Sequence, residues 1–156
     1  LIYDLRPLAL DQLGLTGAIR QQVERFSQQS GTHASFETPG DVALAPITEV
    51  TVLRVVQECL TNIQKHAQAT QVEISLQVMD AGLELRIKDN GRGFDRRKVV
   101  SGAVQNGHGL LNMQERAELL GGSLSVQTSP GNGCHVILYI PSQEAGVGAH
   151  SPSFSG

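Results

Sequence analysis

The strongest constraint on the fold is a pair of neighbouring stretches in which apolar and polar residues alternate. Residues 72–78 and 83–87 each carry an apolar side chain at every second position. This period of two is typical of a strand that buries one face and exposes the other to water. Asp80-Ala81-Gly82 lies between the two stretches and is suited to a tight turn. The sequence therefore predicts an antiparallel hairpin with one buried face.

Other elements are predicted on both sides of this hairpin. Helical periodicity begins near residue 15 after a boundary at Arg6-Pro7 and ends near Gly31; a second helix has Pro46 in its first turn and ends near Ala69; a third spans about 110–120 and is capped by Gly121. A short strand is predicted at 33–37. Two more are predicted near the C-terminus, one that begins at 124 and one over 136–140, and a turn at 129–133 joins them. This order predicts an α+β protein, a two-layer α/β sandwich whose mixed, mostly antiparallel sheet has helices on one face.

Composition excludes several classes of function. A chain of 156 residues forms one domain, and its net charge of −3 argues against a nucleic-acid-binding protein. The sequence contains no apolar run long enough to cross a membrane, so we expect a soluble fragment without membrane contact. Cys59 and Cys134 lack metal-ligand spacing and are expected to be reduced thiols in a cytoplasmic protein. The chain opens at Leu1 in mid-pattern, so it is expected to be part of a longer protein.

The second predicted helix has a polar edge beside its apolar stripe. Glu58, Asn62, Lys65 and His66 stand at i, i+4, i+7 and i+8, and such positions stack on one side of an α-helix. An acid, a neutral carbonyl, an ammonium group and an imidazole together suit a magnesium-polyphosphate ligand. A solvated face of an ordinary amphipathic helix is the alternative.

A second motif follows the predicted hairpin. Asp89 ends the strand, and Gly91 and Gly93 follow it. A carboxylate can accept a hydrogen bond from an exocyclic amine, and glycines allow the backbone to approach a flat ring. The alternative is a simple strand-ending turn, because Asp-Asn-Gly is a common turn sequence. A calcium loop fits poorly, since Gly91 would occupy a ligand position.

A third motif, Gly107-His108-Gly109-Leu110, opens the last predicted helix. Backbone amides at a helix N-terminus attract anions, and glycines admit phosphate oxygens closely. A glycine hinge before an ordinary helix is the alternative. The motif is neither a P-loop nor a dinucleotide fingerprint. Residues 95–106, which precede it, have weak periodicity and are predicted to form a mobile lid.

In this order and spacing, the three motifs resemble the ATP-binding catalytic domain of bacterial sensor histidine kinases, within the superfamily that includes gyrase, Hsp90 and MutL. The resemblance covers roughly residues 1–141 and implies the Bergerat ATP-binding fold. Leu5-Arg6-Pro7, Leu13-Gly14-Leu15 and the segment 113–122 are similar to the subfamily of nitrate/nitrite sensors.

The resemblance implies a role for each motif. Glu58 would be the catalytic acid that orients water or assists proton transfer, Asn62 would hold Mg²⁺, and Asp89 would bind the adenine amine. Further ATP-binding positions implied by the resemblance are Lys65, His66, Gly91, Gly93, Gly107, His108, Gly109, Leu110 and Cys134. Relatives usually have threonine where this chain has Cys134, and a thiol is a weaker hydrogen-bonding partner than a hydroxyl.

The resemblance also implies partners outside this chain. Residues 1–8 would end the dimerisation and phosphotransfer helix, 9–142 would form the catalytic domain, and 143–156 would be a disordered tail. No histidine here is followed by an acid, so the phosphate acceptor would be a histidine on the dimerisation domain of a homodimer, with a response regulator as the next acceptor. Alternatives are a related ATPase, a serine-kinase anti-sigma factor, or a degenerate interaction module without nucleotide.

Overall fold

The computed structural model describes residues 6–40, 42, 44–93 and 107–142. Along the chain, α1 spans Leu8–Ser30, β1 spans His33–Glu37, and α2 spans Pro46–Asn62 and continues as a short π-helix, η2, over Ile63–Ala67. The hairpin follows as β2, Gln71–Met79, and β3, Gly82–Asp89. Helix α4 spans Gly107–Leu119, β4 spans Ser123–Thr128, and β5 spans Cys134–Pro141. The predicted lid at 95–106 and the predicted tail at 143–156 lie outside the described residues.

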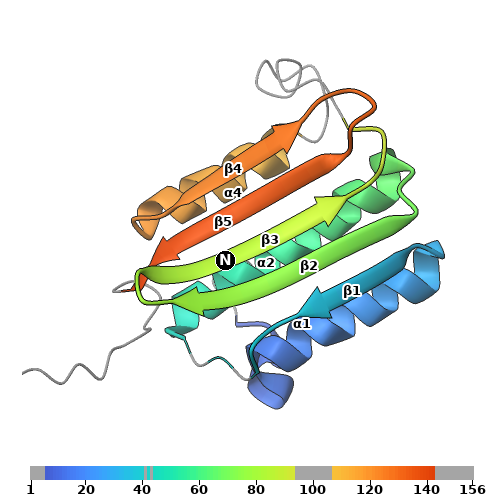
Figure 1. Ribbon diagram of the computed structural model, residues 1–156. Helices are drawn as coiled ribbons and strands as arrows, with labels where there is room; N and C mark the ends of the chain where they lie inside the picture. Colours follow the sequence, from blue (N-terminus) through green and yellow to red (C-terminus); the bar gives the residue numbers. More distant parts are fainter. Residues whose placement is uncertain (1–5, 41, 43, 94–106, 143–156) are drawn as a thin grey trace, which may run out of the picture.

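The described strands form one five-stranded sheet in the order β1-β2-β3-β5-β4 (Figure 1). Strand β1 runs parallel to β2, and the other neighbouring pairs are antiparallel. The predicted hairpin is confirmed, since Val78 pairs with Leu83 and Met79 with Gly82. The prediction of a mixed, mostly antiparallel sheet is therefore confirmed.

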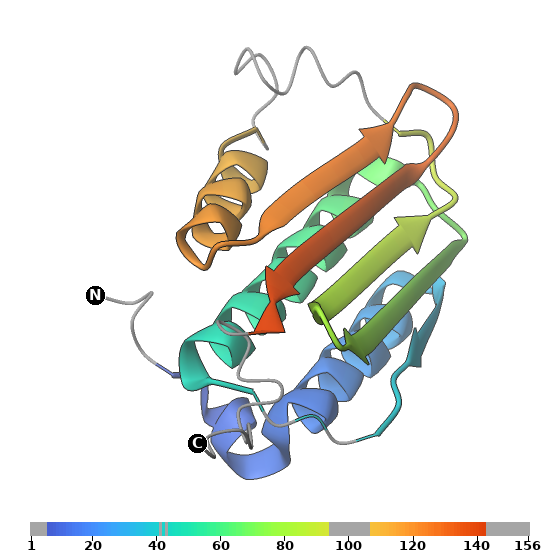
Figure 2. The same ribbon diagram turned by 60° about the vertical axis from the view of Figure 1, so that its left-hand side comes forward.

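Helices α1, α2 and α4 lie together on one face of the sheet (Figure 2). The apolar positions of the strands point toward them, and the core forms between the two layers. Val52, Val55 and Val56 of α2 are completely buried beneath the central strands. Because each strand alternates, its polar positions cover the opposite, open face. The predicted two-layer architecture is confirmed.

Helix α1 begins earlier than the sequence pattern indicated. The helix starts at Leu8, directly after the predicted boundary at Pro7, and it bends at Gly14, which has φ 74° and ψ 175°. Beyond the bend, the predicted apolar stripe faces the core. Arg6 anchors the start of the chain through ion pairs of 2.7 Å with both Glu49 and Asp11.

Helix α4 also begins earlier than predicted, at Gly107 instead of near Leu110. Its predicted C-terminal cap is confirmed, because Gly121 has φ 77°. The amide of Gly122 donates to the Ala117 carbonyl, and that of Gly121 donates to the Glu118 carbonyl. These two bonds form a Schellman motif, which satisfies carbonyls that the helix end leaves without partners.

The end of α2 differs from the prediction of a regular helix reaching Ala69. From Ile63 the backbone forms a π-helix that ends at Ala67, and Gln68 adopts the left-handed conformation with φ 51°. The π-helix bonds residue i to i+5, so its turn is wider than that of an α-helix. Sequence periodicity does not distinguish this wider turn from a regular one.

Candidate functional site

The polar edge of α2 and η2 is present, but its geometry differs from a straight stack. Glu58 and Asn62 lie on the regular part of the helix and are half-buried, whereas Lys65 and His66 lie in η2 and are exposed. The expected positions i+7 and i+8 assumed an α-helix throughout. Because the π-turn adds backbone per turn, it rotates Lys65 and His66 relative to Glu58. The spacing of Lys65 and His66 from Glu58 therefore differs from that in a regular α-helix, and the joint role of the four residues stays a prediction.

Asp89 ends β3 with its carboxylate in a largely buried position. Only 6% of the residue is exposed, and it pairs in register with Val72 and Cys134. Val72 is a core residue, so this row of the sheet faces the helices. The amide of Gly91 donates to Asp89 Oδ1 at 2.8 Å. Burial raises the pKa of Asp89, while backbone hydrogen bonds from Gly91 and Cys134 act in the opposite direction.

A thiol and a hydroxyl lie in the same row as this carboxylate. Thr128 pairs with Cys134, and its hydroxyl donates to the Gly133 carbonyl at 2.8 Å. Burial raises the pKa of the Cys134 thiol to about 11, Asp89 adds to the shift, and Thr128 opposes it. Cys134 is therefore a neutral thiol. Thr128 is not part of any of the three sequence motifs, although counting back across the turn at 129–133 places it opposite Cys134.

The loop after Asp89 packs against the turn between β4 and β5. Gly93 has φ 66°, and a side chain there would collide with the carbonyl oxygens of Ser129 and Gly133. The amide of Gly131 donates to the Arg92 carbonyl. Gly93 is thus required by backbone contact with the turn, a reason that the sequence motif did not indicate.

Asn90 fixes the other side of this loop. Its Oδ1 accepts hydrogen bonds from the amides of Thr70 and Gln71 at 2.9 and 3.0 Å, and its Nδ2 donates to Thr70 Oγ1. The Asn90 amide donates to the Gln71 carbonyl. These hydrogen bonds therefore hold the start of β2 and the end of β3 together next to Asp89.

The first turn of α4 approaches α2 at Glu58. A Cβ atom on Gly109 would lie 2.5 Å from Glu58 Oε2 and 2.8 Å from its Cδ. Glycine at this position therefore permits the close approach, and Gly109 lies within the helix and is not a hinge before it. Gly107, His108 and Leu110 belong to the same turn, although their side chains lie outside the described part of the structure.

Cys59 follows Glu58 in α2, and its thiol is buried. Burial is the main cause of its raised pKa, and the charges of Glu58 and Asp89 and the Cys134 thiol add to the effect. The start of α4 approaches α2 where Gly109 meets Glu58, and Asp89 of β3 pairs with Cys134 of β5.

Residues 47–144 match the family described as histidine kinase-, DNA gyrase B- and HSP90-like ATPases. The chain belongs to this family. This ATPase domain is 37% identical over 142 residues to the signal transduction histidine-protein kinase/phosphatase DegS of Brevibacillus brevis, a match that covers 90% of the chain and 36% of DegS. It is also 37% identical to the oxygen sensor histidine kinase NreB of Staphylococcus carnosus, over 88% of the chain and 39% of NreB. The domain thus spans little more than a third of these relatives.

Solved structures share the fold of this domain. The ATPase domain superimposes with a TM-score of 0.59 on the ATP-binding domain of PrrB from Mycobacterium tuberculosis, at 25% identity over 80% of this chain and 90% of that one. It superimposes with a TM-score of 0.61 on the histidine kinase domain of a blue-light-activated kinase from Erythrobacter litoralis, at 22% identity over 85% of this chain and 63% of that one. The predicted resemblance to sensor histidine kinases and the Bergerat fold is confirmed.

The donor set of the ATPase domain suits a magnesium ion that is bound together with phosphates. Among the described residues, no group of three His, Cys, Asp or Glu side chains could hold a metal by itself. Mg²⁺ commonly binds through one or two protein oxygens, several waters and substrate phosphates. The side-chain carbonyl of Asn62 would be such a protein oxygen ligand.

The helices described by the structure, over residues 6–40, 42, 44–93 and 107–142, include none with the length and hydropathy of a membrane span.

Proposed function

We propose that this domain binds Mg-ATP between the polar edge of α2 and the Asp89 end of β3, and transfers the γ-phosphoryl group to a histidine of the kinase's dimerisation domain. A cytoplasmic response regulator would receive the phosphoryl group from that histidine. The names of the relatives DegS and NreB support a histidine acceptor. The same names favour this function over a serine-kinase anti-sigma factor.

The buried carboxylate of Asp89 carries this proposal. Two backbone amides, from Gly91 and Cys134, orient it, and it retains capacity to accept a hydrogen bond from the adenine amine. A charge-assisted bond in such a buried place contributes roughly 1.5–3 kcal/mol. The neutral Cys134 thiol beside it contributes less polarity than a hydroxyl would. Asp89 therefore supplies most of the polar recognition of the base.

The phosphate end of the proposed site lies along α2, η2 and the first turn of α4. Asn62 would hold Mg²⁺, which supplies charge neutralisation to the phosphate oxygens when bound. The amides at the start of α4 favour anions because the helix dipole is positive there. As the new N–P bond forms and the bond to ADP breaks, the acceptor imidazole loses a proton, and Glu58 would be the base that accepts it.

Calorimetric titration of the 156-residue chain with Mg-ADP tests the binding step. We expect micromolar or weaker affinity and a roughly ten- to hundredfold weaker affinity for Asp89→Asn, because the charge-assisted bond is lost. Asp80→Asn, in the exposed turn between β2 and β3, is the matched control and should bind like the wild type. Circular dichroism checks that both variants fold. Absence of binding by the wild type, or equal binding by Asp89→Asn, would contradict the proposal.

Radiolabelled ATP tests the transfer step. The chain alone should acquire no acid-labile phosphate, whereas an added dimerisation domain from the same kinase should become labelled. Glu58→Gln should slow this labelling without weakening nucleotide binding, because the amide cannot accept the proton. Label on the isolated chain would show that the acceptor histidine is misassigned.

A further inference from the structure

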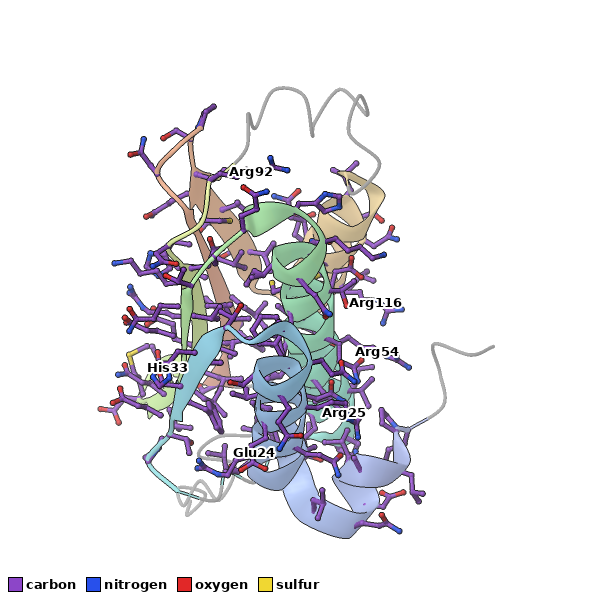
Figure 3. All side chains as sticks on the ribbon, turned by 90° about the vertical axis from the view of Figure 1, so that its right-hand side faces the viewer. Glu24, Arg25, His33, Arg54, Arg92 and Arg116 are labelled. Atoms are coloured by element: carbon purple, nitrogen blue, oxygen red, sulfur yellow. The ribbon has the colours of Figure 1, made fainter. Side chains whose placement is uncertain are left out.

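Arg92 connects three parts of the site that are far apart in the sequence. Its Nε donates to the carbonyl oxygen of His66 at 2.6 Å, and its own carbonyl accepts from Gly131. It stands between Gly91 and Gly93 in the loop after β3. Figure 3 shows Arg92 at this end of the sheet, beside the end of the helix formed by α2 and η2. Arg92 therefore joins the end of η2, the loop beside Asp89 and the β4–β5 turn.

The hydrogen bond to His66 falls where η2 lacks internal partners. The last carbonyls of a helix have no intrahelical donor, and a cation at this end also complements the helix dipole. η2 is a π-helix followed by Gln68 with positive φ, two uncommon conformations in succession. Such a segment persists where the surrounding structure holds it. Arg92 provides such a hold through its hydrogen bond to the His66 carbonyl.

We infer that Arg92 is a positioning residue: it holds η2 so that Lys65 and His66 face the phosphate end of a nucleotide whose base is bound at Asp89. The inference rests on the proposed function, because it assigns the two ends of the site to the base and the phosphates. Lys65 and His66 are exposed, so their placement depends on the backbone of η2. Asn90, in contrast, anchors the loop to β2 and acts on the base end.

Three substitutions separate the hydrogen bond of Arg92 from its charge. Arg92→Gln places a neutral amide donor the same number of bonds from Cα as the arginine Nε. Arg92→Met has a similar length but no donor. Arg92→Lys retains the charge and moves the donor one bond farther out. Arg20→Met, which removes a surface arginine stacked on Phe36 of β1, controls for the loss of one positive charge.

NMR titrations of the chain with Mg-ADP and with adenosine measure the two ends of the site separately. If Arg92 acts through η2, Arg92→Met should weaken Mg-ADP binding about five- to tenfold, whereas Arg92→Gln should stay within about twofold of the wild type. Adenosine affinity should be unchanged in both. Hydrogen exchange should be faster at the amides of η2 in Arg92→Met, and unchanged in Arg92→Gln and Arg20→Met.

Each other outcome overturns the inference. If Arg92→Gln and Arg92→Met lose Mg-ADP affinity equally and Arg92→Lys keeps the affinity of the wild type, the positive charge at position 92 acts on the phosphates directly. Loss of adenosine binding in Arg92→Met would assign Arg92 to the base end, and unchanged binding and exchange would remove any role. If the wild type fails to bind Mg-ADP, the proposed function fails, while hydrogen exchange at η2 still reports whether Arg92 holds this turn.

Discussion

Replacing Gly109 with alanine should displace the carboxylate of Glu58, the proposed proton acceptor, without unfolding the domain. The new Cβ atom would lie 2.5 Å from Glu58 Oε2, 2.8 Å from Cδ and 3.3 Å from Cγ. An ordinary contact between carbon and oxygen is close to 3.4 Å, so the carboxylate must move by roughly 1 Å. Because the collision involves the far end of a flexible side chain, Glu58 can rotate away at a cost of about 0.5–1.5 kcal/mol.

The substitution also has a favourable effect on stability. Alanine is preferred over glycine inside a helix by up to about 1 kcal/mol. The two contributions nearly cancel, so the free energy of unfolding of Gly109→Ala should be close to that of the wild type. Phosphoryl transfer should nevertheless fall by up to roughly a hundredfold, since a misplacement of about 1 Å can have this effect on catalysis.

A double-mutant cycle with Glu58→Ala tests this reasoning. Glu58→Ala removes the three atoms that the new Cβ would meet. In that background Gly109→Ala should stabilise the domain by about 1 kcal/mol, which corresponds to roughly 2–4 °C in Tm for a chain of this size. Urea and thermal unfolding measure the effect of Gly109→Ala on stability in the wild-type and in the Glu58→Ala background. The same change in stability in both backgrounds would show that Gly109 does not contact Glu58.

Three further perturbations test other parts of the structure. Because burial raises the pKa of Asp89 above the ordinary 3.8, nucleotide affinity should begin to fall at a higher pH than for an exposed aspartate. Between the raised pKa of the folded state and the ordinary pKa of the unfolded state, the contribution of Asp89 to stability should instead increase as the pH falls, because folding favours its protonated form. Calorimetry would measure nucleotide affinity and urea unfolding would measure stability at the same pH values; a parallel fall of both would contradict this prediction. Asn62→Asp should weaken Mg-ADP binding and leave adenosine binding unchanged, since a carboxylate beside the phosphates adds repulsion; identical titrations with and without EDTA would count against Asn62 as a magnesium ligand. Arg6→Met should lower the free energy of unfolding by about 1–2 kcal/mol, because it leaves the nearly buried Glu49 without its ion-pair partner. Arg20→Met is the control in thermal unfolding, and equal Tm values for the two variants would refute that role.

The sequence by itself determined the type and order of the elements and several of their boundaries. Alternation over 72–78 and 83–87 indicated the central hairpin. Pro46 marked the start of α2 and Gly121 marked the end of α4, as the structure shows. These signals are local, because a strand's period, a first-turn proline and a C-terminal glycine each depend on a few neighbouring residues. The ordered motifs around Asn62, Asp89 and Gly109 also indicated the family.

Only the tertiary structure decided how those motifs meet. The π-helical turn at Lys65 and His66, the contact of Gly109 with Glu58, the row from Asp89 to Thr128 and the hydrogen bond from Arg92 to His66 all depend on elements distant in the sequence. Local patterns fix which face of an element is buried, but the spacing between two faces follows from side-chain packing. A turn such as η2 differs from a regular helix by one hydrogen-bond step, and its uncommon geometry is held by partners that the local sequence does not contain.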